Sequence, residues 1–167
     1  GVKVLSAPEG NRDAVGEHAI ALTLNLFNHL NRADRQVREG RWSREENRGR
    51  ELGAMTIGII GFGHMGSSFA QKLRGFGCRI LAYDKYKQNY APAFVEEVSL
   101  AELQAQADLV SLHLPLTEET HHYLSPEFIA GMTKPFYLIN TARGNQVSIP
   151  VLLQAMSEGK ILGAGLD

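Results

Sequence analysis

Cysteine is nearly missing from this sequence of 167 residues, because Cys78 is the only one. A single thiol can form neither an internal disulfide nor a thiolate metal site, and its scarcity fits a reducing compartment, so we expect a cytoplasmic protein without a bound metal. An excess of positive charge is lacking too, since 17 basic and 18 acidic residues give a net charge of −1. This balance argues against nucleic acid or an anionic membrane surface as a partner.

Long apolar runs are also missing. No uncharged stretch approaches the roughly 18 residues that a membrane span requires, and the first residues do not read as a signal peptide. Hydrophobic residues nevertheless make up 44% of the chain and charged residues 21%, which is ordinary globular composition. We therefore expect a soluble protein with one sizeable core and no membrane partner.

The N-terminal part, residues 1–50, is predicted to contain a connector, a long helix and a charged loop. Residues 1–11 read as a short apolar strand or connector followed by a loop. Asn11 or Asp13 is expected to cap a helix that continues to about residue 37. Apolar residues surround most of this helix around Ala19–Leu30, so it should be buried on two sides, either between domains of its own chain or in a subunit interface.

Residues 51–167 show a different pattern, in which short apolar segments alternate with helices, and we assign them to a second unit on which residues 1–50 pack. The apolar segments lack period-two alternation, as expected for strands that are buried on both faces. Strands are predicted at Met55–Ile60, Arg79–Asp84, Asp108–His113, Phe136–Asn140 and Ile161–Asp167. The alternation predicts an α/β fold with a doubly wound parallel sheet covered by helices on both faces.

The strongest local signal is the glycine-rich turn GFGHMG at residues 61–66, between a predicted strand and a predicted helix. Gly61 allows the tight turn, Gly63 lets the backbone approach a pyrophosphate, and Gly66 lets the helix pack on the sheet. The start of the helix adds free N–H groups and a partial positive charge, and His64 and Met65 are expected in the turn, where their N–H groups and side chains can meet the ligand. In this context the motif predicts a Rossmann-type dinucleotide-binding domain, although glycines can also serve only to shape a turn.

Asp84 ends the second predicted strand, 18 positions after Gly66. This is close to the offset of about 20 residues expected for the acid that binds a ribose diol. A carboxylate accepts hydrogen bonds from both hydroxyls and repels a 2′-phosphate, so NAD is favoured over NADP. Lys85 and Lys87 weaken this preference, because either can reach a phosphate. Alternatively, Asp84 is only a turn residue at the end of a strand.

Polar side chains also follow the next two predicted strands. The carboxyl ends of parallel strands face the ligand crevice, so His113, Leu114 and Pro115 should line a cofactor cleft into which Thr120 can direct its hydroxyl. His113 is equally compatible with a structural role. Arg143 follows the fourth strand, and its planar, permanently charged fork suits a carboxylate or an α-keto acid. The alternative is a surface arginine in a loop.

Together these residues resemble the NAD-binding domain of the D-2-hydroxyacid dehydrogenases, a family that includes D-3-phosphoglycerate dehydrogenase. Five ordered motifs carry the resemblance, which covers essentially the whole chain: GN with VGE at 10–17, GFGHMG with Asp84, HLPLT at 113–117, NTARG at 140–144 and GAGLD at 163–167. The resemblance implies hydride transfer between NAD and a small 2-hydroxy or 2-keto acid, with 3-phosphoglycerate among the candidates. It also supports a homodimer formed through the helix around Ala19–Leu30.

The resemblance implies roles for single residues as well. Arg143 matches the catalytic arginine beside the nicotinamide, which holds the substrate carboxylate and polarises its carbonyl. Asp167 matches the acid that binds the nicotinamide carboxamide. Val15, Thr141 and Ala142 match positions packed around the nicotinamide and its ribose.

Some features of the sequence restrict these expectations. His64 stands where the family usually has a basic residue at the pyrophosphate. The family's acid–base histidine and its glutamate partner would follow Asp167, and none of the six histidines here occupies that position, so we expect this chain to bind NAD without turnover. Two other functions share the fold: an NADH-sensing protein like the C-terminal-binding-protein corepressors, and an enzyme like formate dehydrogenase.

Overall fold

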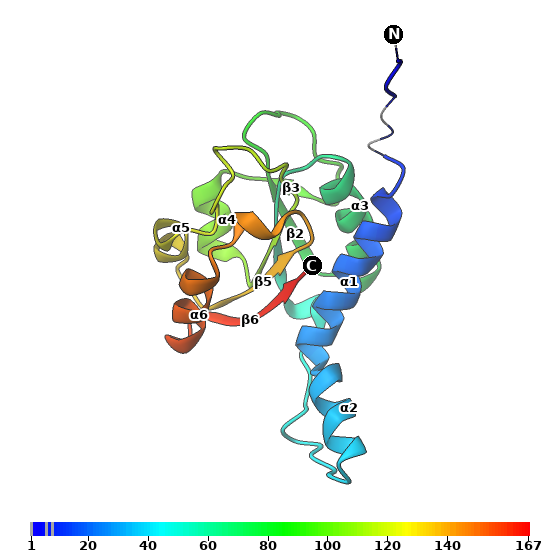
Figure 1. Ribbon diagram of the computed structural model, residues 1–167, viewed down its shortest axis with the longest axis vertical. Helices are drawn as coiled ribbons and strands as arrows, with labels where there is room; N and C mark the ends of the chain where they lie inside the picture. Colours follow the sequence, from blue (N-terminus) through cyan, green and yellow to red (C-terminus); the bar gives the residue numbers. More distant parts are fainter. Residues whose placement is uncertain (1, 6, 8) are drawn as a thin grey trace.

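The computed structural model describes residues 2–5, 7 and 9–167, and its centre is a parallel sheet with helices on both faces (Figure 1). The strands of the described chain are β1 (Thr56–Ile60), β2 (Arg79–Tyr83), β3 (Glu96–Glu97), β4 (Leu109–Leu112), β5 (Phe136–Asn140) and β6 (Ile161–Leu166). Their order across the sheet is β3-β2-β1-β4-β5-β6, so the direction of winding reverses between β1 and β4. The predicted α/β fold with a doubly wound parallel sheet is confirmed.

All five predicted strands are present, with ends that differ from the prediction by one residue or less. Strand β3 was not predicted; it pairs with β2 at the edge of the sheet and consists of two exposed glutamates. Helices connect the strands: α3 (His64–Leu73), α4 (Leu100–Gln106), α5 (Pro126–Gly131) and α6 (Ile149–Ser157), preceded by α1 (Arg12–Asn28) and α2 (Leu30–Arg38).

The prediction of a single helix that continues to about residue 37 is wrong, because the segment is divided into α1 and α2. His29 separates them in the left-handed conformation (φ 53°), and its N–H donates to the carbonyl of Asn25. The side chain of Asn25 accepts a hydrogen bond from Asn31 N (2.9 Å), so local side-chain bonding replaces a continuous helix. Asn11 immediately precedes α1, but within the described chain its side chain makes no capping hydrogen bond.

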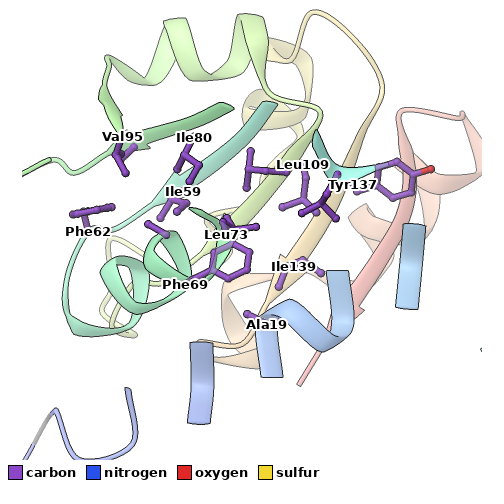
Figure 2. Packing of buried hydrophobic residues seen from close by; sticks show 14 of the residues in the cluster. Ala19, Ile59, Phe62, Phe69, Leu73, Ile80, Val95, Leu109, Tyr137 and Ile139 are labelled. Carbon is purple, nitrogen blue, oxygen red and sulfur yellow. The ribbon is translucent and has the colours of Figure 1, made fainter. Parts of the chain in front are cut away.

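Two apolar clusters cover the two faces of the sheet. Ala19, Phe69 and Tyr137 belong to the cluster under α1 and α3 (Figure 2). In the same cluster the rings of Phe27 and Tyr137 meet edge to face at 4.7 Å. The other cluster lies under α4, α5 and α6. Helix α1 also packs on β6, where a Cβ at Gly165 would lie 3.1 Å from Leu22 Cβ, so glycine allows the close approach.

The N-terminal connector is only partly described. Residues 1, 6 and 8 of the predicted connector lie outside the described residues, and residues 2–5 have no regular secondary structure. No helix in the described part of the chain combines the length and apolar character that a membrane crossing needs. Cys78 is partly buried just before β2, and burial raises the pKa of its thiol. The cytoplasmic location and the division at residue 50 stay predictions.

Candidate cofactor site

The turns that follow β1, β2 and β4 border a cavity of about 280 Å³. The strand order reverses between β1 and β4, and in open α/β sheets ligands bind at this switch point. Predicted site residues on this cavity are Gly61, Gly63, Asp84, His113, Leu114, Pro115 and Thr120. Three motifs that are distant in the sequence therefore meet at one place. The volume of the cavity is just below the roughly 300 Å³ at which typical small-molecule pockets begin.

The three glycines of the turn differ in what surrounds them. Gly61 has a positive φ of 89°, and a Cβ there would lie 2.6 Å from the carbonyl oxygen of His113. A Cβ at Gly66, where α3 packs on the sheet, would lie 2.1 Å from the carbonyl oxygen of Gly61. At Gly63 the added Cβ would have no described atom within 4 Å. The fold itself requires Gly61 and Gly66, whereas the space at Gly63 fits the approach of a ligand.

Asp84 joins the end of β2 to the glycine turn. Its Oδ2 accepts a hydrogen bond from Phe62 N (2.9 Å), and its Oδ1 accepts one from Tyr86 N (3.0 Å). The carboxylate is partly buried and lines the cavity. Asp84 is therefore a turn residue and a cavity residue at once. Lys87 supports the same turn, because its Nζ donates to Phe62 O at 2.7 Å.

His113 is both a cavity residue and a structural residue, the two roles that the sequence left open. Its Nε2 lies 2.8 Å from Ser111 Oγ, and its ring packs at a tilt on Phe69 with the centroids 5.4 Å apart. Burial lowers the pKa of His113 to about 4, so the imidazole is neutral at pH 7. The ring contributes an uncharged wall to the cavity and is held by the structure at the same time.

The hydroxyl of Thr120 stabilises the loop to which it belongs. It donates to Pro115 O (2.6 Å) and accepts a hydrogen bond from Thr117 N (2.8 Å), which closes the turn after β4. Gln146, which the sequence did not single out, braces the same loop from the segment after β5. It is fully buried and its Nε2 donates to Leu114 O at 2.8 Å. Thr120 lines the cavity, and its contact with a cofactor stays a prediction.

The turn after β5 is organised by Asn140, another residue whose role the sequence did not indicate. Its buried side chain accepts a hydrogen bond from Ala142 N (3.1 Å) and donates one to Arg143 O (2.9 Å). The signal that could have identified this role of Asn140 is its place in the sequence, where an amide residue ends an apolar strand. Beside it, Thr141 Oγ1 is buried without a hydrogen-bond partner among the described residues, which fits a polar ligand atom at this position.

The other predicted residues lie outside the cavity. Arg143 is exposed, and its Nη1 donates to Ala142 O at 2.6 Å. Asp167 is also exposed, with its N–H bonded to Asn140 O and its carboxylate 3.8 Å from His18 Nε2. Val15 and Met65 are partly buried on α1 and α3, whereas His64, which begins α3, is exposed.

Comparisons with known proteins agree with this geometry. A family model described as "D-isomer specific 2-hydroxyacid dehydrogenase, NAD binding domain" matches residues 20–167. Hydroxypyruvate reductase from Thermotoga maritima is 39% identical over 167 residues, which cover 100% of this chain and 54% of that protein. The chain thus spans about half the length of the curated relatives it matches.

Solved structures show the same relationship. The apo structure of D-lactate dehydrogenase from Escherichia coli matches with a TM-score of 0.90 and 34% identity, covering 100% of this chain and 53% of that one. D-lactate dehydrogenase from Aquifex aeolicus, complexed with NAD and lactic acid, matches with a TM-score of 0.87 and 38% identity, covering 96% and 48%.

Proposed function

Because the chain belongs to the D-isomer-specific 2-hydroxyacid dehydrogenase family as its NAD-binding domain, we propose that it serves hydride transfer between NAD and a small 2-hydroxy or 2-keto acid. The observation that carries this proposal is the cavity between β1, β2 and β4, where Gly63 leaves open space and Asp84 presents a carboxylate. The names of similar proteins include hydroxypyruvate reductase and D-lactate dehydrogenase. The proposal therefore covers the class of small 2-hydroxy acids, in which 3-phosphoglycerate is one candidate.

The residues at the cavity suit the adenosine end of the cofactor. NAD, when bound, supplies the nicotinamide ring that accepts or donates the hydride. The N–H groups at the start of α3 would hold the pyrophosphate, and Gly63 allows the backbone to come close to it. Asp84 would accept hydrogen bonds from the ribose hydroxyls, and the neutral ring of His113 would form part of the wall.

The residues after β5 and β6 suit the reacting end. Arg143 would bind the substrate carboxylate through its exposed guanidinium and polarise the carbonyl. Thr141 and Ala142 would pack beside the nicotinamide and its ribose, and Asp167 would hold the carboxamide. His113 is not proposed as the acid–base group, because its pKa of about 4 and its contact with Ser111 make it a poor proton donor at neutral pH.

The test begins with calorimetric titration of the chain with NAD and with NADP. We expect NAD to bind and NADP to bind more weakly, and NADP binding of equal strength would contradict the role of Asp84. The chain alone should give no turnover with NADH and 2-keto acids. In any longer protein that carries this domain, NADH oxidation should depend on a 2-keto acid. NAD-dependent oxidation of formate in place of this reaction would favour the formate dehydrogenase alternative.

We further propose that the chain forms a homodimer through the helix around Ala19–Leu30, and that the interface extends to α2 and the loop that follows. Leu30 is 52% exposed, Val37 54% and Trp42 82%, on a segment that extends away from the sheet (Figure 1). Val37 and Trp42 border the same surface hollow, and contiguous exposed apolar side chains are typical of an interaction surface. Sedimentation should show a dimer that Trp42→Ala weakens. A monomer at high protein concentration would contradict the proposal.

A further inference from the structure

The two loops that border the cavity are joined at its edge by three side chains. Lys85 and Tyr86 follow β2, and Glu119 follows β4. The ammonium group of Lys85 forms an ion pair with the carboxylate of Glu119, and the hydroxyl of Tyr86 donates a hydrogen bond to it. All three side chains line the same cavity as Asp84. We call this group the Glu119 bridge.

The bridge occupies the place at which dinucleotide-binding domains distinguish their cofactors. An acid at the end of the second strand selects NAD, whereas a cation near it accommodates the 2′-phosphate of NADP. This chain has both, since Asp84 is followed by Lys85 and Lys87. The sequence therefore leaves the selectivity undecided, and the contacts of the two lysines become important.

Both lysines are engaged in the structure. Lys87 donates to the carbonyl oxygen of Phe62 at 2.7 Å, and Lys85 is paired with Glu119. The contact raises the pKa of Lys85 and lowers that of Glu119, so both groups are ionised at neutral pH. The two carboxylates, of Asp84 and Glu119, thereby balance the two ammonium groups that border the cavity.

We propose that Glu119 helps to select NAD over NADP by holding Lys85 away from a 2′-phosphate and by adding a negative charge at that side of the cavity. This rests on the proposed function, in which the cavity receives the adenosine ribose. Without the charge of Glu119, Lys85 is free to approach the phosphate, and the net charge of the ionised groups that border the cavity becomes positive. The side chains of Lys85 and Glu119 are 56% and 45% exposed, and ion pairs in such positions are weak, so we expect about a fivefold change in selectivity rather than a reversal.

The experiment compares Glu119→Gln, Lys85→Gln and the double variant with the unchanged chain, using calorimetric titration with NAD and with NADP. Glu119→Gln should tighten NADP binding about fivefold relative to NAD. The double variant should lose this gain, because the gain requires the ammonium group of Lys85. Raising the salt concentration should also reduce the gain, since the 2′-phosphate contact is electrostatic.

The matched control is Glu118→Gln, which removes the same charge from an exposed neighbour outside the described lining of the cavity. It should leave the ratio of the two affinities unchanged. An unchanged ratio in Glu119→Gln, or a gain that survives in the double variant, would overturn the role of Glu119 while leaving NAD binding established. If the unchanged chain binds no NAD, the proposed function fails, and this inference fails with it.

Discussion

The two ends of the cleft differ in how completely the domain builds them. At the ends of β1, β2 and β4, which we call the cavity end, two of the side chains that border the cavity are held by the domain itself: Asp84 by two N–H groups, and His113 by a hydroxyl. At the ends of β5 and β6, which we call the open end, Arg143 and Asp167 are exposed. The comparison indicates that the sheet and its loops alone shape the first end. At the second end the same domain leaves the functional side chains exposed.

The largest expected effect tests how tightly the cavity end is packed. Gly66→Ala should lower the free energy of unfolding by about 3 kcal/mol, because its Cβ would lie 2.1 Å from a backbone oxygen and the turn must shift. Urea unfolding measures the loss. Gly63→Ala is the matched control: its φ of −89° suits alanine and its Cβ would meet no described atom, so stability should hold while NAD binding weakens. If Gly66→Ala proved as stable as the unchanged chain, the turn would be looser than described.

A second test of the cavity end measures how stability depends on pH. The pKa of His113 is about 4 in the folded chain, against an ordinary value of 6.5. Below pH 6.5 the unfolded chain therefore binds a proton that the folded chain does not, and stability falls as the pH decreases to about 4. The full loss is about 3 kcal/mol, at 1.36 kcal/mol per pKa unit. Urea unfolding of His113→Gln between pH 7 and pH 4 should show a shallower decrease, whereas parallel curves would place His113 in solvent.

The next effect concerns NAD binding at the cavity end. Asp84→Ala should weaken NAD binding by about 2 kcal/mol, because charge-assisted hydrogen bonds to the ribose are lost. The N–H groups of Phe62 and Tyr86 lose their acceptor at the same time, so the glycine turn should become less ordered. Calorimetry gives the affinity. Asp84→Asn is the control that keeps an acceptor oxygen and removes the charge. An unchanged affinity in Asp84→Ala would limit this residue to the turn.

Much of the fold could be predicted because its signals are local. Strands buried on both faces require continuous apolar runs, and Phe136–Asn140 has the same bounds in the structure as in the prediction. The capping box of Ser99 and Glu102 that begins α4 can likewise be recognised from residue types at a fixed spacing. Strand β3 depends only on its pairing with β2, and the break at His29 depends on the side chain of Asn25. Neither feature leaves an apolar pattern.

The same distinction applies to the candidate site. The glycine turn and Asp84 could be predicted, because their spacing encodes the geometry of a strand, a turn and a helix. Gln146 and Glu119 could not, since each acts on a segment that is distant in the sequence. Asn140 lies within the NTARG motif, but its hydrogen bonds to the following turn become visible only in the structure.

The smallest expected effect belongs to the open end. The guanidinium of Arg143 is exposed, and its one hydrogen bond among the described residues goes to the adjacent carbonyl of Ala142. Arg143→Ala should therefore leave the affinity for NAD within about twofold of the unchanged chain and the free energy of unfolding within about 0.5 kcal/mol. The same calorimetric titration measures the first, and urea unfolding measures the second.

In any longer protein that carries this domain, Arg143→Lys is the informative partner variant. Lysine keeps the positive charge and loses the planar fork that can bind a carboxylate through two hydrogen bonds, so turnover with a 2-keto acid should fall steeply while NAD binding holds. Full activity in Arg143→Lys would show that charge alone suffices at this position. A large loss of NAD affinity in Arg143→Ala would make Arg143 a ligand of the cofactor. The open end would then contribute to NAD binding as the cavity end does, and the functional difference between them would disappear.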